Sequence, residues 1–238
     1  MNIEEADSNG YTALIIASAF GKTNVGHFLL SKGACVSWTN AFGLPALFFA
    51  AKEGHLEMCK ELVAKGADAN QKSDNSSPWL EACKKGHLNI VEFFANNGQY
   101  MEATGSDGDT GLIAASFNGN ADVVRFLLSK NARFGRTIDE GFSPLFLAAR
   151  QGHLDVCKLL VTNGADVNRE SENGFSPWLE ACGKGHLDIV MKNAYFRRTV
   201  ALSFRSTCRT AKHFFVLGEV VIIFVKNNVK YLKACSQL

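Results

Sequence analysis

Ser77-Pro-Trp-Leu-Glu-Ala-Cys-Lys-Lys-Gly-His-Leu88 is the stretch of sequence that decides the fold, because the chain repeats it. Its first seven residues recur unchanged at Ser176–Cys182, and its final Gly-His-Leu recurs at three further places. More divergent copies centre on Gly21 and Gly119. The marker glycines lie at residues 21, 54, 86, 119, 152 and 185, with spacings of 33, 32, 33, 33 and 33. A regular period of this length indicates a solenoid of stacked repeats.

Each repeat carries the local signals of two helices. Three Ser-Pro pairs place a side-chain acceptor before the first helix and a proline at its first position: Ser77-Pro78, Ser143-Pro144 and Ser176-Pro177. The Gly-His pair then ends this helix, and a second one follows with apolar residues at helical spacing, as in Leu154, Val156, Leu159 and Leu160. Residues suited to the left-handed conformation end the second helix, at Gly33, Gly66, Gly98, Asn131 and Gly164. A helix pair of this size cannot bury its apolar faces alone, so we expect stacking.

This pattern resembles the ankyrin repeat, whose inter-repeat signature is nearly matched by Gly66-Ala-Asp-Ala-Asn70 and Gly164-Ala-Asp-Val-Asn168. The resemblance implies an all-α, right-handed solenoid of helix–turn–helix repeats with β-turn fingers. It covers about residues 7–190 of an expected ankyrin-repeat domain at 1–190, as six repeats at about 7–38, 39–71, 72–103, 104–136, 137–169 and 170–190, the last one truncated. The histidine of the family's Thr-Pro-Leu-His motif is replaced by Ile15, Phe48, Leu80, Ile113, Phe146 and Leu179, so packing must substitute for its hydrogen bond.

A longer repetition lies over the first. Phe28-Leu-Leu-Ser-Lys32 recurs as Phe126-Leu-Leu-Ser-Lys130, 98 residues further on, and the stretch at 77–83 recurs at 176–182. Repeats one to three therefore look like a duplicate of repeats four to six. We expect Trp79 and Trp178 to be equivalent core residues.

The repeat pattern stops within the sixth copy, and residues 191–238 form a non-repeat basic tail of unknown structure. Three interpretations stay open: a partner-binding module, a cap over the end of the stack, or a sequence joined on by splicing or a gene-model error. The most apolar stretch, Phe214–Val225, is interrupted by Gly218 and Glu219 and is shorter than the about 20 residues of a spanning helix. We therefore expect no membrane anchor, and we expect the β-branched run Val220–Val225 to be buried.

Charge and cysteine usage narrow the class of protein. Residues 192–238 carry nine lysines or arginines and one glutamate, which leaves sixteen basic and twenty-two acidic residues in the rest of the chain. Against this acidic balance, the densest basic residues predict a solvated face rather than a nucleic-acid groove; they are Lys84, Lys85, Arg125, Arg133 and Arg136. The start of the sequence has no signal-peptide pattern, and the seven cysteines are scattered. We expect reduced thiols and a cytoplasmic or nuclear protein.

No residue pattern supports catalysis, a cofactor or a metal. Gly21-Lys22-Thr23 lacks the preceding glycine of a phosphate-binding loop and fits a turn between helices. The pairs His55/Cys59 and His153/Cys157 supply two ligands where a structural zinc site needs four, so we expect the histidines to satisfy backbone groups and the cysteines to fill the core. Polar residues recur with the repeat, whereas a catalytic site would break the repetition once. We predict neither an enzyme nor a small-molecule substrate.

The resemblance implies instead a protein–protein interaction scaffold that binds its partner in a concave groove formed by the fingers and the first helices. Aromatic and basic residues at these places are our candidate partner-binding residues; they are Trp38, Phe42, Phe142, Phe175, Phe20, Phe117, Lys84, Lys85 and Arg150. The family also suggests asparagine hydroxylation at Asn70 and Asn168, each with a leucine eight residues earlier.

The rival hypothesis is a substrate adaptor of a ubiquitin ligase. Some ankyrin proteins end in a SOCS box that docks elongins. Ser203-Phe204-x-x-x-Cys208-x-x-Ala211 loosely resembles the start of that box, and Val229-Lys230-Tyr231-Leu232 resembles its end. Lys212 stands where the box has an apolar residue, and no Leu-Pro segment precedes the end, which puts the adaptor hypothesis in doubt.

Overall fold

The computed structural model describes residues 2–73, 76–98, 102–105, 107–191, 216–217, 220–225 and 228–233. The chain divides into two compact units, Met1–Asn193 and Ala194–Leu238. The first holds the helical repeats, and the second holds the described strands.

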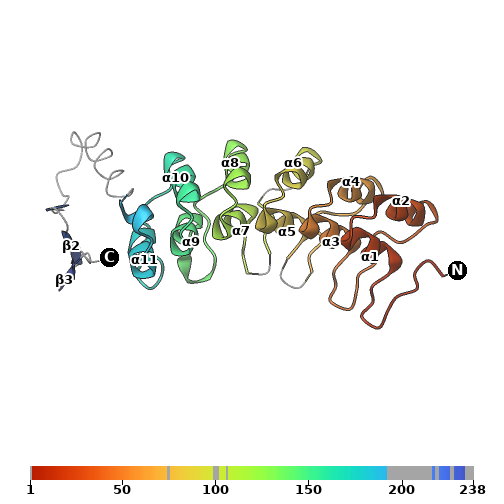
Figure 1. The fold of residues 1–238 in the computed structure, drawn as a ribbon, viewed down its shortest axis with the longest axis horizontal. Coiled ribbons are helices and arrows are strands. Elements are labelled where there is room, and N and C mark those ends of the chain that lie inside the picture. The colour runs from red at the N-terminus through yellow and green to blue at the C-terminus, as the bar shows by residue number, and fades with distance from the viewer. Residues whose placement is uncertain are drawn as a thin grey trace. The chain divides into compact units, whose positions relative to one another are not determined.

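The first unit is a row of helix pairs, as the sequence predicts. The first helices of successive pairs lie in one row and the second helices in another (Figure 1). The first helices are α1 (Ala13–Ala19), α3 (Ala46–Glu53), α5 (Pro78–Lys85), α7 (Gly111–Asn118), α9 (Pro144–Gln151) and α11 (Pro177–Lys184). The second helices are α2 (Thr23–Ser31), α4 (Leu56–Ala64), α6 (Leu88–Asn96), α8 (Ala121–Ser129) and α10 (Leu154–Thr162). Residues 187–191 are helical too and follow α11.

Helix ends follow the local signals in the sequence. Before α5, the Ser77 hydroxyl accepts a hydrogen bond from the Leu80 amide at 3.3 Å, and the serines before α9 and α11 do the same. Gly54 ends α3 in the left-handed conformation, with φ at +85°. Asn131 follows α8 with φ at +62°, which confirms its expected replacement of glycine at the end of a second helix. Gly54 and Asn131 thus stand where the chain leaves a helix with a positive φ, a conformation that both residue types tolerate.

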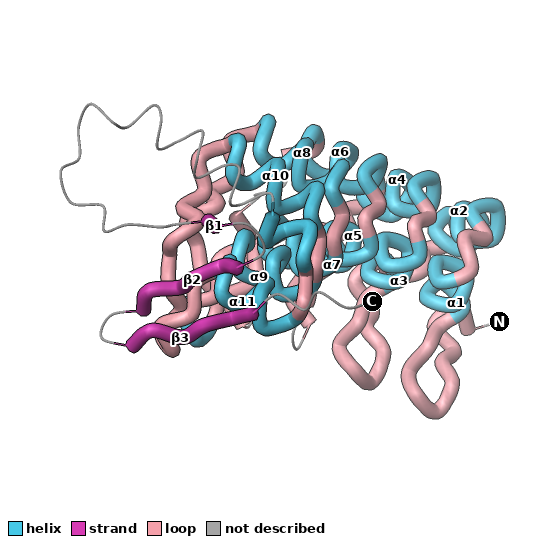
Figure 2. The backbone as a smooth tube through the Cα atoms, turned by 60° about the vertical axis from the view of Figure 1, so that its left-hand side comes forward, coloured by secondary structure: helices cyan, strands magenta, loops and turns pink. Residues whose placement is uncertain are grey.

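Finger-like loops connect the pairs and extend from the side of the first helices (Figure 2). Isolated β-bridges close four of them: Ala6–Thr12, Thr39–Pro45, Ser73–Ser76 and Thr104–Thr110. The finger before α9 instead contains the 3-10 turn η1 (Asp139–Gly141), in which Glu140 has φ at +62°. Glu140 is a non-glycine residue in the left-handed region that the sequence pattern does not predict.

The core fits together through matched sizes between neighbouring repeats. Trp79 on α5 is fully buried, and Gly111 on α7 leaves room for it. A Cβ atom on Gly111 would lie 2.9 Å from Sγ of Cys83 and 3.0 Å from Nε1 of Trp79, so both buried side chains would have to shift. The two repeats therefore approach closely only because Gly111 has no side chain.

The expectation that Trp79 and Trp178 are equivalent in burial is wrong. Trp178 on α11 stays half-buried, although its surrounding sequence is the same. In the described part of the chain, no further first helix packs on α11 as α7 packs on α5. Identical sequence gives different burial here because burial in a stack depends on the next repeat.

From repeat two onward, a hydrogen bond from the residue just before the second helix ties each repeat to the preceding one. Nε2 of His55 donates to the carbonyl oxygen of Ala19, at the end of the preceding first helix, at 3.1 Å. His87, His153 and His186 make the equivalent bonds to Lys52, Phe117 and Arg150, each at 3.0 Å. Asn120 takes this place in repeat four and donates to the carbonyls of both Cys83 and Lys84 at 2.8 Å. The histidines thus satisfy backbone groups, as predicted.

Each of these rings also lies against a glycine of the preceding repeat. A Cβ atom on Gly54 would lie 2.7 Å from Cε1 of the His87 ring, and a Cβ on Gly119 would lie 2.5 Å from Nδ1 of His153. Five of the six marker glycines therefore serve both a left-handed turn and a close contact across the repeat boundary, whereas Gly185 serves the turn and no described atom lies within 4 Å of its added Cβ.

The second unit contains a three-stranded antiparallel sheet in the order β1 (Val216–Leu217), β2 (Val220–Val225) and β3 (Asn228–Lys233). The β-branched run singled out in the sequence forms β2. Of the SOCS-like residues, 203–211 lie outside the described residues, and Val229–Leu232 lie in β3, paired with β2. No helix among the described residues is long and apolar enough to cross a membrane.

Candidate protein-binding surface

Most of the candidate partner-binding residues lie on the fingers or on the C-terminal halves of the first helices, which together we call the finger face. Four of its aromatic side chains are exposed: Phe20 (68%), Phe42 (58%), Phe175 (49%) and Phe117 (42%). The candidate Trp38 is exposed too (40%), but it lies outside this surface. Phe42 lies at a finger tip, inside the Thr39–Pro45 bridge, whereas Trp38 lies just before the bridge, at the foot of the finger. The finger face therefore presents isolated apolar side chains on a fixed backbone.

Phe20 and Phe117 lie where the first helices end. Phe20 is the C-terminal cap of α1, and its amide donates to the carbonyl of Ile16. The carbonyl of Phe117 accepts the inter-repeat bond of His153, so the backbone is held while the ring faces solvent. These two rings are available to a partner without any rearrangement of the array.

Phe142 differs from the exposed aromatics, because the protein itself uses its ring. The ring stacks on Phe146 with centroids 4.6 Å apart and planes 8° from parallel. The Arg150 guanidinium lies 5.8 Å from the centre of the Phe142 ring, and its Nε is 3.5 Å from a carboxylate oxygen of Glu180 in the next repeat. Phe142 and Arg150 thus have structural roles that the sequence analysis did not anticipate, and only their outer surfaces can meet a partner.

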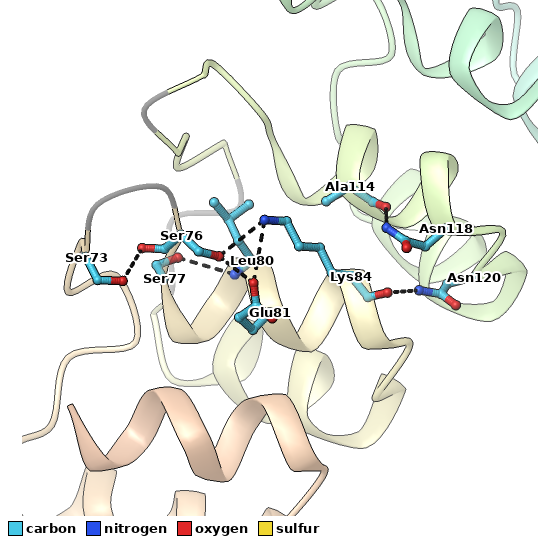
Figure 3. Close-up of polar contacts among 9 residues, drawn as sticks. All are labelled: Ser73, Ser76, Ser77, Leu80, Glu81, Lys84, Ala114, Asn118 and Asn120. Carbon is cyan, nitrogen blue, oxygen red and sulfur yellow. Dashed lines mark hydrogen bonds and ion pairs between the residues drawn. The ribbon is translucent and has the colours of Figure 1, made fainter. Parts of the chain in front are cut away.

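Lys84 is also part of an internal network (Figure 3). Its ammonium lies 3.5 Å from a carboxylate oxygen of Glu81, and the Ser76 hydroxyl donates to the same oxygen at 2.7 Å. Glu81 is buried at a position where repeats two and five have Phe49 and Leu147. A buried carboxylate needs such partners, because an unpaired charge away from water is costly. Lys85, the neighbouring candidate, is exposed.

Asp109, in the following repeat, extends this network. Burial raises the pKa of its carboxyl, the charge of Lys84 opposes that rise, and Asp107 adds to it. The ammonium of Lys84 therefore stabilises carboxylates on both sides of the boundary between repeats three and four.

Replacing Lys84 with methionine is expected to lower the free energy of unfolding by about 1–3 kcal/mol, because Glu81 stays buried with Ser76 as its remaining partner. Urea denaturation followed by circular dichroism measures this. Lys85→Met is the matched control and should change stability by less than about 0.5 kcal/mol. Adding Glu81→Gln to Lys84→Met should restore most of the loss; if the loss persists, the ion pair is not its cause.

The cysteines suit a core rather than a reactive site. Cys59 and Cys157 are buried, and burial raises the pKa of each thiol to about 12. The histidines paired with them in the sequence, His55 and His153, are committed to backbone carbonyls. Among the described residues, no group of three or more His, Cys, Asp or Glu side chains could hold a metal ion. Gly21 and Lys22 lie in the turn between α1 and α2, as predicted, and Thr23 is the first residue of α2.

The two asparagines suggested for hydroxylation lie in equivalent turns. The amides of Asn70 and Asn168 each donate to a carboxylate oxygen of the aspartate two residues earlier, Asp68 and Asp166, at 2.8 and 2.9 Å. Leu62 and Leu160, eight residues before them, are fully buried. Hydroxylation at either site therefore remains a prediction.

The sequence analysis missed Asn120 as an inter-repeat residue. It occupies the histidine position of repeat four, so an alignment of the repeats in register would have marked it. Its amide can donate two hydrogen bonds and here donates to two carbonyls.

Comparisons with known proteins agree with this architecture. A family model described as ankyrin repeats (3 copies) matches residues 1–73, 47–138, 79–171 and 112–192. The crystal structure of the human ASB11 ankyrin repeat domain superposes with a TM-score of 0.74 and 26% identity, covering 81% of this chain and 87% of that one.

Curated relatives match over shorter segments. The mouse "Protein fem-1 homolog A-like" is 34% identical over 92 residues, which is 39% of this chain and 14% of that protein. The human "Protein phosphatase 1 regulatory subunit 27" is 34% identical over 86 residues, which is 36% of this chain and 56% of that protein. The matches thus span less than two thirds of these relatives. Together with the stacked helix pairs and fingers, the family match over most of the sequence shows that the chain belongs to the ankyrin-repeat family.

Proposed function

We propose that the chain is a protein–protein interaction scaffold that binds a partner through the finger face and performs no catalysis. The observation that supports this most directly is the set of exposed aromatic rings at 20, 42, 117 and 175, which lie on fingers or at the ends of first helices in four different repeats. Aromatic residues are enriched among those that dominate binding energy in protein interfaces. The human relative named as a protein phosphatase 1 regulatory subunit supports the same class of function.

The proposed partner presents apolar pockets to these rings and acidic groups to the exposed lysines. Phe42, Phe117 and Phe175 carry apolar area on different repeats, so one extended partner surface would contact several of them. Lys85 and Lys184 are the exposed cations at the ends of α5 and α11. Binding requires no cofactor in this proposal, because surface complementarity supplies the specificity. The free thiols at Cys35, Cys59, Cys83, Cys157 and Cys182 fit a reducing compartment, and we propose the cytoplasm.

The test is an affinity capture from cell lysate with the full chain, followed by a binding measurement with the purified partner. The variant Phe42→Ala/Phe117→Ala is expected to weaken partner binding by tenfold or more, on the order of 1–3 kcal/mol. Isothermal titration calorimetry of both proteins gives the dissociation constants.

Phe28→Ala is the matched control for this experiment. Phe28 is equally exposed at 52%, but it lies on the second helix α2, away from the fingers. If the finger-face variant binds normally while Phe28→Ala weakens binding, the partner uses the opposite surface and the proposal is wrong. Capture of elongins by the full chain would instead favour the adaptor hypothesis.

A further inference from the structure

A pocket of about 640 Å³ lies away from the finger tips, at the C-terminal ends of the second helices α8 and α10. The loop after α8 contributes Arg133, Phe134, Gly135 and Arg136 to its lining, and Asn163 follows α10. None of the described lining residues is acidic. A third arginine, Arg169, reaches this place from the next repeat, since its Nη1 donates to the carbonyl oxygen of Gly135 at 2.7 Å.

Two of these arginines have side chains held by contacts within the protein, whereas the side chain of Arg133 is exposed. Glu102, whose side chain is only 15% exposed, lies with one carboxylate oxygen 3.5 Å from Nε of Arg136. Its other carboxylate oxygen accepts a hydrogen bond from the backbone amide of Arg133 at 3.0 Å. The Glu102 carboxylate therefore orients the loop and the guanidinium of Arg136, while the Gly135 carbonyl orients the guanidinium of Arg169. Held side chains lose less conformational freedom when they bind a ligand.

The internal duplication shows that the arginines are not required by the scaffold. The counterparts of Arg133, Arg136 and Arg169, 98 residues earlier, are Cys35, Trp38 and Gln71. The orienting carboxylate is kept, because Glu4 accepts a hydrogen bond from the Cys35 amide as Glu102 does from Arg133. The two halves thus share the carboxylate that holds this loop, and only the second half places arginines there.

Arg133 also gives up a stabilising interaction. The equivalent residues in repeats two and five are Asp68 and Asp166, whose carboxylates accept the backbone amides of Asn70 and Asn168. A guanidinium cannot accept a hydrogen bond, so Arg133 cannot replace this contact. Arg133 thus replaces a negative charge with a positive one and loses a hydrogen bond that stabilises the turn. A substitution of this kind points to a role other than stabilising the fold.

We propose that this pocket binds an acidic segment of a protein partner, through paired carboxylates or a phosphate group. A guanidinium presents parallel N–H donors that match the two oxygens of either group. The pocket goes beyond the proposed function, because it forms a second binding surface at the ends of the second helices. A peptide fits it better than a nucleic acid, because three arginines at one place do not make the extended basic track that a phosphate backbone requires.

Fluorescence polarisation with synthetic peptides and the full chain tests the proposal without knowledge of the finger-face partner. The probes are a short labelled peptide with a run of glutamates, the same peptide with one phosphoserine, and a version with glutamines. The first two should bind and the third should not. Arg133→Gln/Arg136→Gln should weaken binding by about tenfold or more. Tighter binding of the phosphoserine peptide would identify phosphate as the preferred group, and equal binding would identify carboxylates.

Arg125→Gln is the matched control, because Arg125 is an exposed arginine on α8 outside the pocket lining. It should bind the peptides as the unaltered chain does. Thermal unfolding of the double variant, measured alongside, should show a cooperative transition at a somewhat lower temperature than the control, because Glu102 loses Arg136 as its ion-pair partner. The proposal is overturned if no acidic peptide binds, if the double variant binds normally, or if a single-stranded RNA binds through these arginines and the peptides do not. None of these results bears on the finger face, which Phe42→Ala/Phe117→Ala tests separately.

Discussion

Replacing Trp79 with alanine is expected to lower the free energy of unfolding by about 3–5 kcal/mol, the largest loss that we expect from a single substitution in this chain. Trp79 is fully buried between α5 and α7, so truncation leaves a cavity that the neighbouring repeats cannot close. Its Nε1–H is buried without an acceptor among the described residues. Trp79→Phe removes that unsatisfied donor together with some volume, and should therefore cost clearly less than alanine.

Trp178→Ala is the matched control, because Ser176–Cys182 repeats the sequence around Trp79. Trp178 is half-buried, so its truncation should cost about 1–2 kcal/mol. Urea denaturation of the full chain, followed by circular dichroism, gives both values. Equal losses at the two tryptophans would show that they are packed alike, contrary to the structure.

The second large effect is expected at Gly54. Gly54→Ala places a Cβ in a left-handed turn with φ at +85°, which costs about 1–2 kcal/mol. The same Cβ would lie 2.7 Å from the His87 ring, so the ring must move and weaken its bond to the Lys52 carbonyl. That bond contributes about 0.5–1.5 kcal/mol, so the total loss should be about 1.5–3.5 kcal/mol.

Gly66→Ala separates the two causes. Gly66 lies in the same repeat with φ at +91°, but no atom lies within 4 Å of its added Cβ. It should therefore show the conformational cost alone. In a His87→Ala background, Gly54→Ala should fall to the value of Gly66→Ala. If Gly54 and Gly66 give equal losses in the unaltered chain, the histidine contact contributes nothing.

The parts of the fold that are set by neighbouring residues could be predicted from the sequence. Ser77 and Pro78 mark the start of a helix by local hydrogen bonding and fixed backbone geometry, and Asn131 marks an end by tolerating a positive φ. The repeat period then gave the order of the helices. These signals act over a few residues, so they are visible without coordinates.

The parts that depend on contacts between repeats could not be predicted in the same way. The clash that keeps residue 54 a glycine comes from His87, 33 residues away, and the ion pair of Arg136 comes from Glu102. Phe142 looked like a free aromatic because its partner Phe146 also serves as a core residue. The burial of Trp178 depends on whether another first helix packs against α11. In each case the contact depends on how two repeats stack on one another, and the sequence pattern of a single repeat does not predict this.

The fit between Trp79 and Gly111 has a consequence for how the gene can change in length. Loss of repeat four alone would place Pro144 of repeat five where Gly111 now lies, and the proline ring would collide with the indole. Loss of three repeats, from two to four, would instead stack repeat one on repeat five. Leu14, at the position of Trp79, would then face Pro144, as its counterpart Leu112 of repeat four already does in the native chain. Recombination in steps of 98 residues therefore preserves every boundary type, whereas recombination in steps of 33 does not. Length variants of this protein should be found three repeats at a time.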